Sequence, residues 1–184
     1  MKENLNIGVM IDSAVYQSNN SILEKYCYNN NPTNCVLYGG LYSWNEMMQY
    51  STTAGTQGIC PTGWHLPSDP EWCTLTTYLE PTVSCLYDGS SGTLVGGKMK
   101  NIGFTYWNSP NTNATNESGF NARGSGFNQN GTFYWLKDHG YFWTSSLFFM
   151  NYSVYRTLYN DMSTIGRGYI DQTVFGLSVR CVKN

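Results

Sequence analysis

The most reactive side chains in this sequence are its six cysteines and two histidines. Thiols and imidazoles can form disulfides, hold a metal ion, or act as nucleophile and base. No C-x-x-C pair occurs, and His65 and His139 lie far apart in the chain. An even set of cysteines without metal-ligand spacing favours disulfides and an oxidising compartment, with a metal site as the alternative.

The cysteine spacing also predicts which cysteines pair. Two pairs are local: one flanks a short polar loop, and the other brackets the end of a predicted helix. The remaining two cysteines would then join the middle of the chain to its C-terminal part. The predicted disulfides are Cys27–Cys35, Cys73–Cys85 and Cys60–Cys181.

Groups for acid–base or nucleophilic catalysis are few. His65 lies between two large apolar residues in a turn, where packing would orient it, and His139 is predicted to be an exposed loop residue. A general acid or base needs a positioned partner, and neither a G-x-S-x-G nor an H-E-x-x-H motif occurs. The sequence therefore favours a non-enzymatic protein with no catalytic residue and no metal.

Residues 92–98 come close to a phosphate-binding loop, because they fit the frame G-x-x-x-x-G-K. The next residue is Met99, whereas that loop requires a Ser or Thr hydroxyl to bind magnesium. The flanking pattern also lacks a strand before the loop and a helix after it. Nucleotide binding is therefore disfavoured, and no cofactor is predicted.

Composition restricts the partners and the compartment. The net charge is −2 and charged residues make up 12% of the chain, so a nucleic-acid interface is disfavoured. No apolar run is long enough to cross a bilayer, and the first residues lack the apolar segment of a signal peptide. Because the cysteines indicate export, we expect a secreted or cell-surface protein. Either its leader is missing from this sequence, or the chain is a fragment of a larger surface protein.

The element predicted most specifically is a helix over residues 68–80. Ser68 and Glu71 form a capping box, and Pro70 lies in the first turn, where its missing N–H has no intrahelical partner. Apolar residues then recur at helical spacing, which predicts one buried face. These residues are Trp72, Leu75, Tyr78 and Leu79.

The other predicted elements make the chain a single α+β domain over residues 1–184. Short helices are expected from Ser21 toward Tyr26 and after Ser43. In the last predicted strand, apolar residues at every second position predict that one face is buried. The strands are expected within residues 7–11, 121–134 (two strands and a turn), 141–146, 154–159 and 175–182.

The chain resembles the Fibrobacter succinogenes major paralogous domain, which recurs in exported proteins of that bacterium and of Bacteroidetes. The matching segments span almost the whole chain in order. They are residues 3–6, 24–27, 38–44, 60–72, 96–98, 116–121 and 176–182.

Residues 66–72 and 179–182 are similar to landmarks of the formylglycine-generating-enzyme branch of C-type-lectin-like folds. This resemblance implies two main helices packed on a small twisted antiparallel sheet, with neighbouring termini and long loops that carry the binding surface. It does not imply the enzyme, because residues 122–146 hold no reactive cysteine pair. The sugar-binding tripeptides of C-type lectins are also absent, and residues 107–109 come nearest to one.

Residues 147–153 and 159–165 depart from the pattern of the Fibrobacter succinogenes major paralogous domain. Their interleaved aromatic and polar residues resemble the variable face of diversity-generating-retroelement proteins, which also use a C-type-lectin-like fold. The alternative is that Phe148, Phe149 and Met150 form an ordinary strand or core edge, since apolar runs between polar residues are usually buried.

Aromatic residues make up 16% of the chain, so we expect some to be exposed and to bind a ligand. Trp44, Trp64 and Trp72 are assigned to the core. The predicted function is recognition of a protein or carbohydrate ligand at a cell surface. A structural module of a surface appendage and an enzyme of the formylglycine-generating type are the alternatives. The predicted ligand-binding residues are Trp143, Phe148, Phe149, Asn151, Tyr152, Tyr155, Arg156, Tyr159, Asn160, Asp161, Arg167 and Tyr169.

Overall fold

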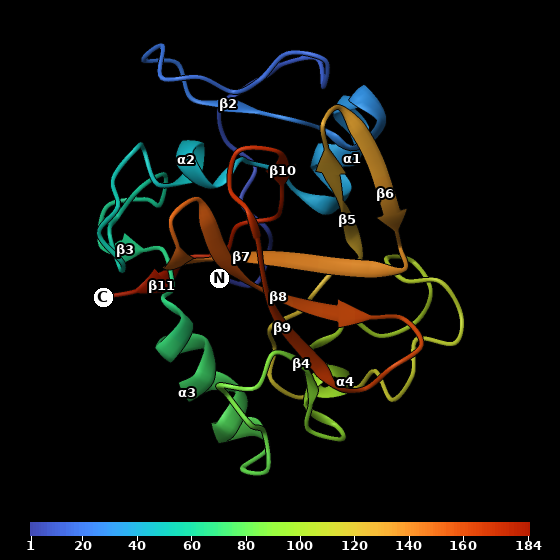
Figure 1. Cartoon of the computed structure of the whole chain (residues 1–184). Coiled ribbons are helices and arrows are strands. Elements are labelled where there is room, and N and C mark those ends of the chain that lie inside the picture. The colour runs from blue at the N-terminus through green and yellow to red at the C-terminus, as the bar shows by residue number, and fades with distance from the viewer.

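A seven-stranded sheet forms the centre of the computed structural model, which describes residues 1–184 (Figure 1). Its strand order is β10-β5-β7-β8-β9-β4, and β6 extends it by pairing with β5. Two pairs of short strands, β1 with β2 and β3 with β11, lie outside it. The strands are β1 (Val9–Met10), β2 (Glu24–Lys25), β3 (Trp64–His65), β4 (Gly89–Ser91), β5 (Ser125–Gln129), β6 (Thr132–Leu136), β7 (His139–Phe149), β8 (Tyr152–Tyr159), β9 (Ile165–Asp171), β10 (Phe175–Gly176) and β11 (Val182–Lys183). The helices are the 3₁₀ helix η1 (Tyr28–Asn30), α1 (Pro32–Tyr38), α2 (Trp44–Met47), α3 (Asp69–Leu79) and α4 (Val95–Met99).

The class is α+β as predicted, with few and short helices. Strands β7, β8 and β9 form an antiparallel meander, whereas β5 joins β7 in parallel through Gly126 and Gly140. The sheet is therefore mixed, and the prediction of an antiparallel sheet was wrong for the pair of β5 and β7. Strand β6 pairs antiparallel with the edge of β5 that does not meet β7. The chain therefore reverses direction after β5 and again after β6, which makes β7 parallel to β5.

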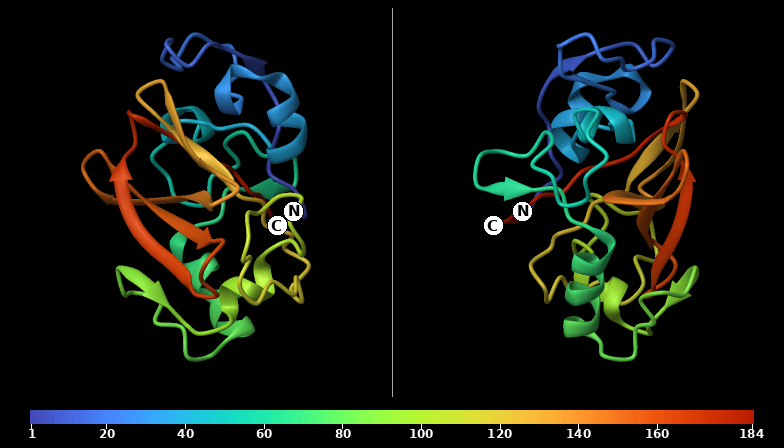
Figure 2. Two further views of the ribbon diagram at one scale, coloured as in Figure 1. Left: turned by 90° about the vertical axis from the view of Figure 1, so that its right-hand side faces the viewer. Right: turned by 60° about the vertical axis from the view of Figure 1, so that its left-hand side comes forward.

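Successive side chains of the central strands enter two cores, one on each face of the sheet. Phe142 packs with Trp72 of α3 on one face, and Trp143 packs in the cluster of Trp44 on the other. Trp44 and Trp72 are buried as predicted, and Trp64 is half-buried against the cluster of Trp44. Helices α1 and α2 lie at the opposite end of the molecule from α3 and α4 (Figures 1 and 2).

Helix α3 begins and ends where the sequence predicted. The capping box of Ser68 and Glu71 is present, and the Glu71 carboxylate accepts a hydrogen bond from the Ser68 amide at 2.8 Å. The prediction was wrong for Tyr78, whose side chain is 84% exposed. Tyr78 lies about 120° around the helix from Trp72, outside the face that meets the sheet.

Two of the shorter helices differ in how well they were predicted. Helix α2 begins after Ser43, whose side chain accepts from the Glu46 amide, as expected. The helix expected from Ser21 is wrong: Ser21 has a φ of +66°, and the following residues form β2 instead. Helix α1 was missed because its cap, Asn31 followed by Pro32, also fits a turn.

All six cysteines form the three predicted disulfides, so the metal alternative for them was wrong. The disulfides indicate an oxidising compartment. The two ends of the chain lie side by side, as expected (Figure 2), since the Met1 amine donates to the Cys181 carbonyl oxygen at 3.0 Å. The longest helix, α3, has 11 residues, and none of the helices has the length and apolarity to cross a membrane.

Residues 175–182 form two short strands, β10 and β11, and not one strand with a single buried face. Ser178 and Arg180, on the second face, are buried as well. The physical reason is that the N-terminal segment covers this face. Asn4 donates to the Ser178 hydroxyl and accepts from the Arg180 guanidinium.

Residues 92–98 follow β4 directly and run into α4, which begins at Val95, so the expectation that the flanking pattern is not strand-then-helix was wrong. The groups that would cradle a phosphate are nevertheless occupied. The Gly96 amide donates to the Ser163 carbonyl oxygen, and the Lys98 amine donates to the Leu79 carbonyl oxygen. A Cβ on Gly96 would lie 2.1 Å from the Thr164 carbonyl oxygen, so this glycine serves close packing.

Candidate ligand-binding surface

The end of the β7–β8 hairpin carries a cluster of exposed apolar side chains, here called the aromatic tip. Its members are between 40% and 75% exposed. The alternative of an ordinary strand or core edge is therefore wrong for the core edge, although Phe148 and Phe149 do lie in the strand β7. The aromatic tip consists of Leu147, Phe148, Phe149, Met150, Tyr152 and the neighbouring Tyr169 of β9.

The strands deliver these side chains to the surface because β7 runs beyond the two cores. Side chains are buried from Phe142 to Ser145 and exposed from Leu147 onward. The pairing of β7 with β8 shifts register between Trp143 and Leu147, and again before Phe149. Such irregularities re-aim side chains at the end of a ladder.

Aromatic stacking orders part of the aromatic tip. The rings of Phe148 and Tyr169 stack with centroids 3.9 Å apart and planes 5° apart, and Tyr152 meets Tyr169 edge-on at 6.3 Å. Met150, in the turn, has a φ of +43°, a left-handed conformation that Gly or Asn adopts at lower cost. The turn therefore places a long apolar side chain in solvent where local conformation favours a small or polar one.

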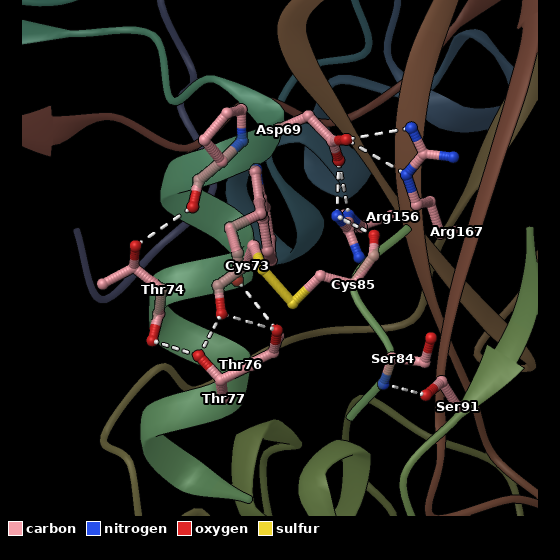
Figure 3. The surroundings of a disulfide bond; sticks show 12 residues. Asp69, Cys73, Thr74, Thr76, Thr77, Ser84, Cys85, Ser91, Arg156 and Arg167 are labelled. Carbon is pink, nitrogen blue, oxygen red and sulfur yellow. Dashed lines mark hydrogen bonds and ion pairs between the residues drawn. A yellow bond between two sulfur atoms is a disulfide. The ribbon is translucent and has the colours of Figure 1, made fainter. Parts of the chain in front are cut away.

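A cluster of charges beneath the sheet joins β8 and β9 to the first turn of α3 (Figure 3). Arg156 and Arg167 are opposite one another in the β8–β9 ladder. Both donate to the carboxylate of Asp69, Arg156 through Nε at 3.1 Å and Arg167 through Nε and Nη2 at 3.0 Å. Arg167 also pairs with Asp88, so two cations meet two anions.

This cluster corrects the prediction that Arg156 and Arg167 bind a ligand. Arg156 is buried, and burial lowers the pKa of its guanidinium despite the neighbouring Asp69. Both guanidinium groups are directed at carboxylates of the chain itself (Figure 3). They hold the helix against the sheet.

Trp143 is a second correction, because it lies in the interior. Its indole N–H donates to the Tyr42 carbonyl oxygen at 2.7 Å, and its ring belongs to the core cluster of Trp44. Alternation along β7 explains this placement. Phe142 enters the core on the α3 side, so Trp143 enters the core on the other side.

The remaining predicted residues divide into two groups. Phe148, Phe149, Asn151, Tyr152 and Tyr169 lie together at the aromatic tip. The other group begins at Tyr155, in the middle of β8, and continues past the far end of that strand, which is about 23 Å from Tyr152. In this group Asp161 is exposed, and Tyr155 and Tyr159 are half-buried. The side-chain amide of Asn160 donates to the Ser109 carbonyl oxygen.

Tyr155 and Tyr159 lie flat over glycines of β9. A Cβ on Gly168 would come within 2.7 Å of the Tyr155 hydroxyl, and a Cβ on Gly166 would come equally close to the Tyr159 hydroxyl. Burial raises the pKa of both phenols. These two tyrosines are therefore part of a packed aromatic surface and not of the aromatic tip.

Trp135, which no sequence pattern singled out, is 52% exposed and belongs to the same surface. It stacks on His139 with centroids 4.9 Å apart. The expectation that His139 is an exposed loop residue was wrong, because it begins β7, is half-buried, and has its pKa lowered by burial. The turn at Asn130, which starts the short strand β6, is the signal that could have placed Trp135 on a strand edge.

His65 lies in β3 near the start of α3, away from the aromatic tip. Its ring nitrogens are 2.6 Å from the Asn184 side-chain oxygen and 2.6 Å from the Glu71 carboxylate. These hydrogen bonds raise the pKa of His65. No group of three or more His, Cys, Asp or Glu side chains has the arrangement to hold a metal ion.

Fold and surface together define a disulfide-stabilised α+β domain with an apolar surface at the end of its central hairpin. The chain belongs to the Fibrobacter succinogenes major domain family, whose family model matches residues 1–183. Comparison with curated proteins and with solved structures found no match.

Proposed function

We propose that this chain is a non-enzymatic recognition domain that binds a protein or glycan ligand through the aromatic tip. The observation that carries the proposal is the cluster of six large side chains held in solvent at one end of the sheet. Contiguous exposed apolar surface of this kind marks interaction sites on soluble proteins. Exposed aromatic rings also stack on sugars and anchor protein interfaces at low entropy cost.

Polar groups beside the rings support specificity. The Tyr152 and Tyr169 side chains are exposed at the aromatic tip, and Asn151 lies exposed in the turn between the two strands. Phenols and amides supply donors and acceptors that orient a ligand against an apolar surface. The chemistry of the surface therefore fits recognition better than acid–base catalysis.

We further propose a C-type-lectin-like arrangement. Paired chain ends, one long helix packed on a twisted sheet, and an irregular stretch between α4 and β5 all support it. Exposure of the aromatic tip is consistent with a face that tolerates sequence variation, as in diversity-generating-retroelement proteins. The disulfides support export to the cell surface or the medium.

The two alternatives make different use of the same features. A structural module would use the aromatic tip for self-association, and sedimentation over a wide concentration range tests this directly. The thiol chemistry of a formylglycine-generating enzyme would need a free cysteine, whereas all six cysteines are paired. The recognition role is therefore our preferred function.

Capture on arrays of polysaccharides and of extracellular proteins tests the proposal. The test variant replaces Phe149, Met150 and Tyr152 with serine. The matched control replaces three other exposed apolar residues, elsewhere on the surface, with serine. The control residues are Val36, Leu86 and Ile102.

We expect the wild type and the control to capture the same ligand and the test variant to lose it. Capture that is unchanged in the test variant, or lost equally in the control, would contradict the proposal. Absence of any specific capture by the wild type on both arrays would also count against it.

A further inference from the structure

A groove of about 880 Å³ lies between α3 and the two ends of the chain. This volume is in the range of pockets that bind small molecules. The groove shares no residue with the aromatic tip, so a ligand bound in it would be independent of the ligand proposed for the aromatic tip. Its apolar walls are formed by Trp64, Pro67, Leu75, Tyr78, Phe120 and Val182.

The floor of the groove consists of aromatic rings that pack at an angle to one another, with a buried cation beside them. Trp72 packs on Phe120 with ring centroids 5.5 Å apart, and the Arg180 guanidinium lies 4.4 Å from the Phe120 ring. Arg180 is 2% exposed. No carboxylate lies within ion-pair distance of it, although a buried charge is normally paired.

Hydrogen-bond donors at this floor outnumber their acceptors. The Arg180 guanidinium makes four hydrogen bonds, to Asn4, Met1, Phe120 and Asn121, and an arginine carries about five N–H groups. The indole N–H of Trp72, which is buried, has no acceptor at all. The groove therefore lies over a positive charge that no carboxylate of the chain pairs, and over one indole N–H without an acceptor.

The rim of the groove has the same sign of charge. Lys2 and Lys183 line it, are exposed, and form no ion pair. The only acidic lining residue is Glu71, and its carboxylate already binds the Ser68 amide and hydroxyl and the His65 ring. The end of the groove near the chain termini is therefore cationic, and the walls beyond it are apolar.

We propose that this groove binds an elongated apolar molecule that carries a carboxylate, such as a long-chain fatty acid. The carboxylate lies at the terminal end, near Lys2 and Lys183, in the field of Arg180. The apolar chain lies along Trp64, Leu75 and Phe120. A peptide fits less well, because each peptide unit requires hydrogen-bond partners, whereas the side-chain hydroxyls along the walls are those of Thr74, Tyr78 and Ser118.

Titration calorimetry with dodecanoate below its micelle concentration tests this assignment. The dodecyltrimethylammonium cation serves as the probe of opposite charge. We expect the wild type to bind dodecanoate about tenfold or more tightly than the cation, because a charged rim selects by sign. Replacing both Lys2 and Lys183 with glutamate should remove this preference.

The matched control replaces Lys25 and Lys137 with glutamate. It changes the net charge by the same amount, and neither residue lines the groove, so we expect dodecanoate binding to stay at the wild-type level. A second variant, Thr74→Trp, places a bulky ring in the groove from an exposed position on α3. It should abolish binding of dodecanoate and leave the midpoint of thermal unfolding unchanged.

Indole N–H resonances locate the bound ligand. Dodecanoate should shift the resonances of Trp64 and Trp72 and leave that of Trp135, which is on a different surface, unchanged. Four results would overturn the proposal. They are no binding of dodecanoate, equal binding of the cation, a shift of Trp135 alone, and tighter binding of the acidic peptide acetyl-Leu-Phe-Leu-Asp than of dodecanoate.

Discussion

Trp72 at the junction of α3 with the sheet and Phe149 at the aromatic tip are both large aromatic residues, with exposures of 3% and 60%. Around Trp72 the chain concentrates a capping box, two disulfides and a paired charge cluster. Around Phe149 it has one ring stack and a strained turn. The difference indicates that the junction determines stability and that the aromatic tip contributes little to it, as the proposed binding role requires.

The disulfide that joins the junction to the chain end should have the largest effect. Replacing Cys60 and Cys181 with serine opens a loop of 121 residues, and the chain-entropy model assigns this a cost of about 5 kcal/mol. The control replaces Cys73 and Cys85, which close 12 residues, with an expected cost of about 3 kcal/mol. Urea unfolding measures both, and the reverse order would contradict a junction held chiefly by the long-range disulfide.

Removing the carboxylate of Asp69 should cost nearly as much. Asp69→Ala leaves the guanidinium groups of Arg156 and Arg167 without their shared anion, and breaking a buried pair costs about 3–5 kcal/mol. The control is Asp161→Ala at an exposed acid, which should change the free energy of unfolding by less than about 0.5 kcal/mol. Equal effects of the two variants would show that the charge cluster does not secure the helix.

The cap of α3 should have a smaller effect. Ser68→Ala removes a hydroxyl that donates to Glu71 at 2.7 Å, and loss of an N-cap side chain costs about 1 kcal/mol. Thr74→Ala on the exposed side of the same helix is the control, and its free energy of unfolding should not fall below that of the wild type, because alanine has the higher helix propensity. A cost for Ser68→Ala below that of the control would mean that the capping box is not needed.

The smallest predicted effect depends on pH and distinguishes the two histidines. Hydrogen bonds to Asn184 and Glu71 raise the pKa of His65 in the folded protein. The stability that protonated His65 contributes is therefore complete below the unfolded pKa, about 6.5, and is lost as pH rises through the folded pKa. Burial lowers the pKa of folded His139, so folding is disfavoured as pH falls through the unfolded value.

Thermal midpoints at pH 5.5 and pH 8.5 test these signs. His65→Gln should lower the midpoint at the acidic pH and have little effect at the alkaline pH. Relative to the wild type, His139→Gln should lower the thermal midpoint more at pH 8.5 than at pH 5.5. The same change at both pH values for either variant would contradict the assigned pKa direction.

Local signals account for the features that the sequence predicted correctly. The capping box at Ser68, the turn at Asn130 and the cysteine spacings each act within a short stretch of chain, so their outcome does not depend on distant partners. The strand β9 was missed because its glycines, Gly166 and Gly168, do not resemble a strand. They are required there by the tyrosines that lie across them.

The candidate site was predicted only in part, because burial is decided by distant contacts. Arg156 looks like a surface residue until Asp69, far away in the sequence, binds it. An apolar run such as residues 147–150 has the same sequence pattern whether it is buried in a core or exposed to solvent. Its exposure follows from the length of β7 beyond the cores, which no local pattern records.

The most direct test measures unfolding and ligand capture on the same preparation of the Phe149, Met150 and Tyr152 triple serine variant. We predict a free energy of unfolding within about 1 kcal/mol of the wild type, because exposed side chains contribute little, together with loss of capture. A drop of about 3 kcal/mol or more would mean that these side chains form part of the core. Unchanged capture in a stable variant would mean that the ligand binds elsewhere.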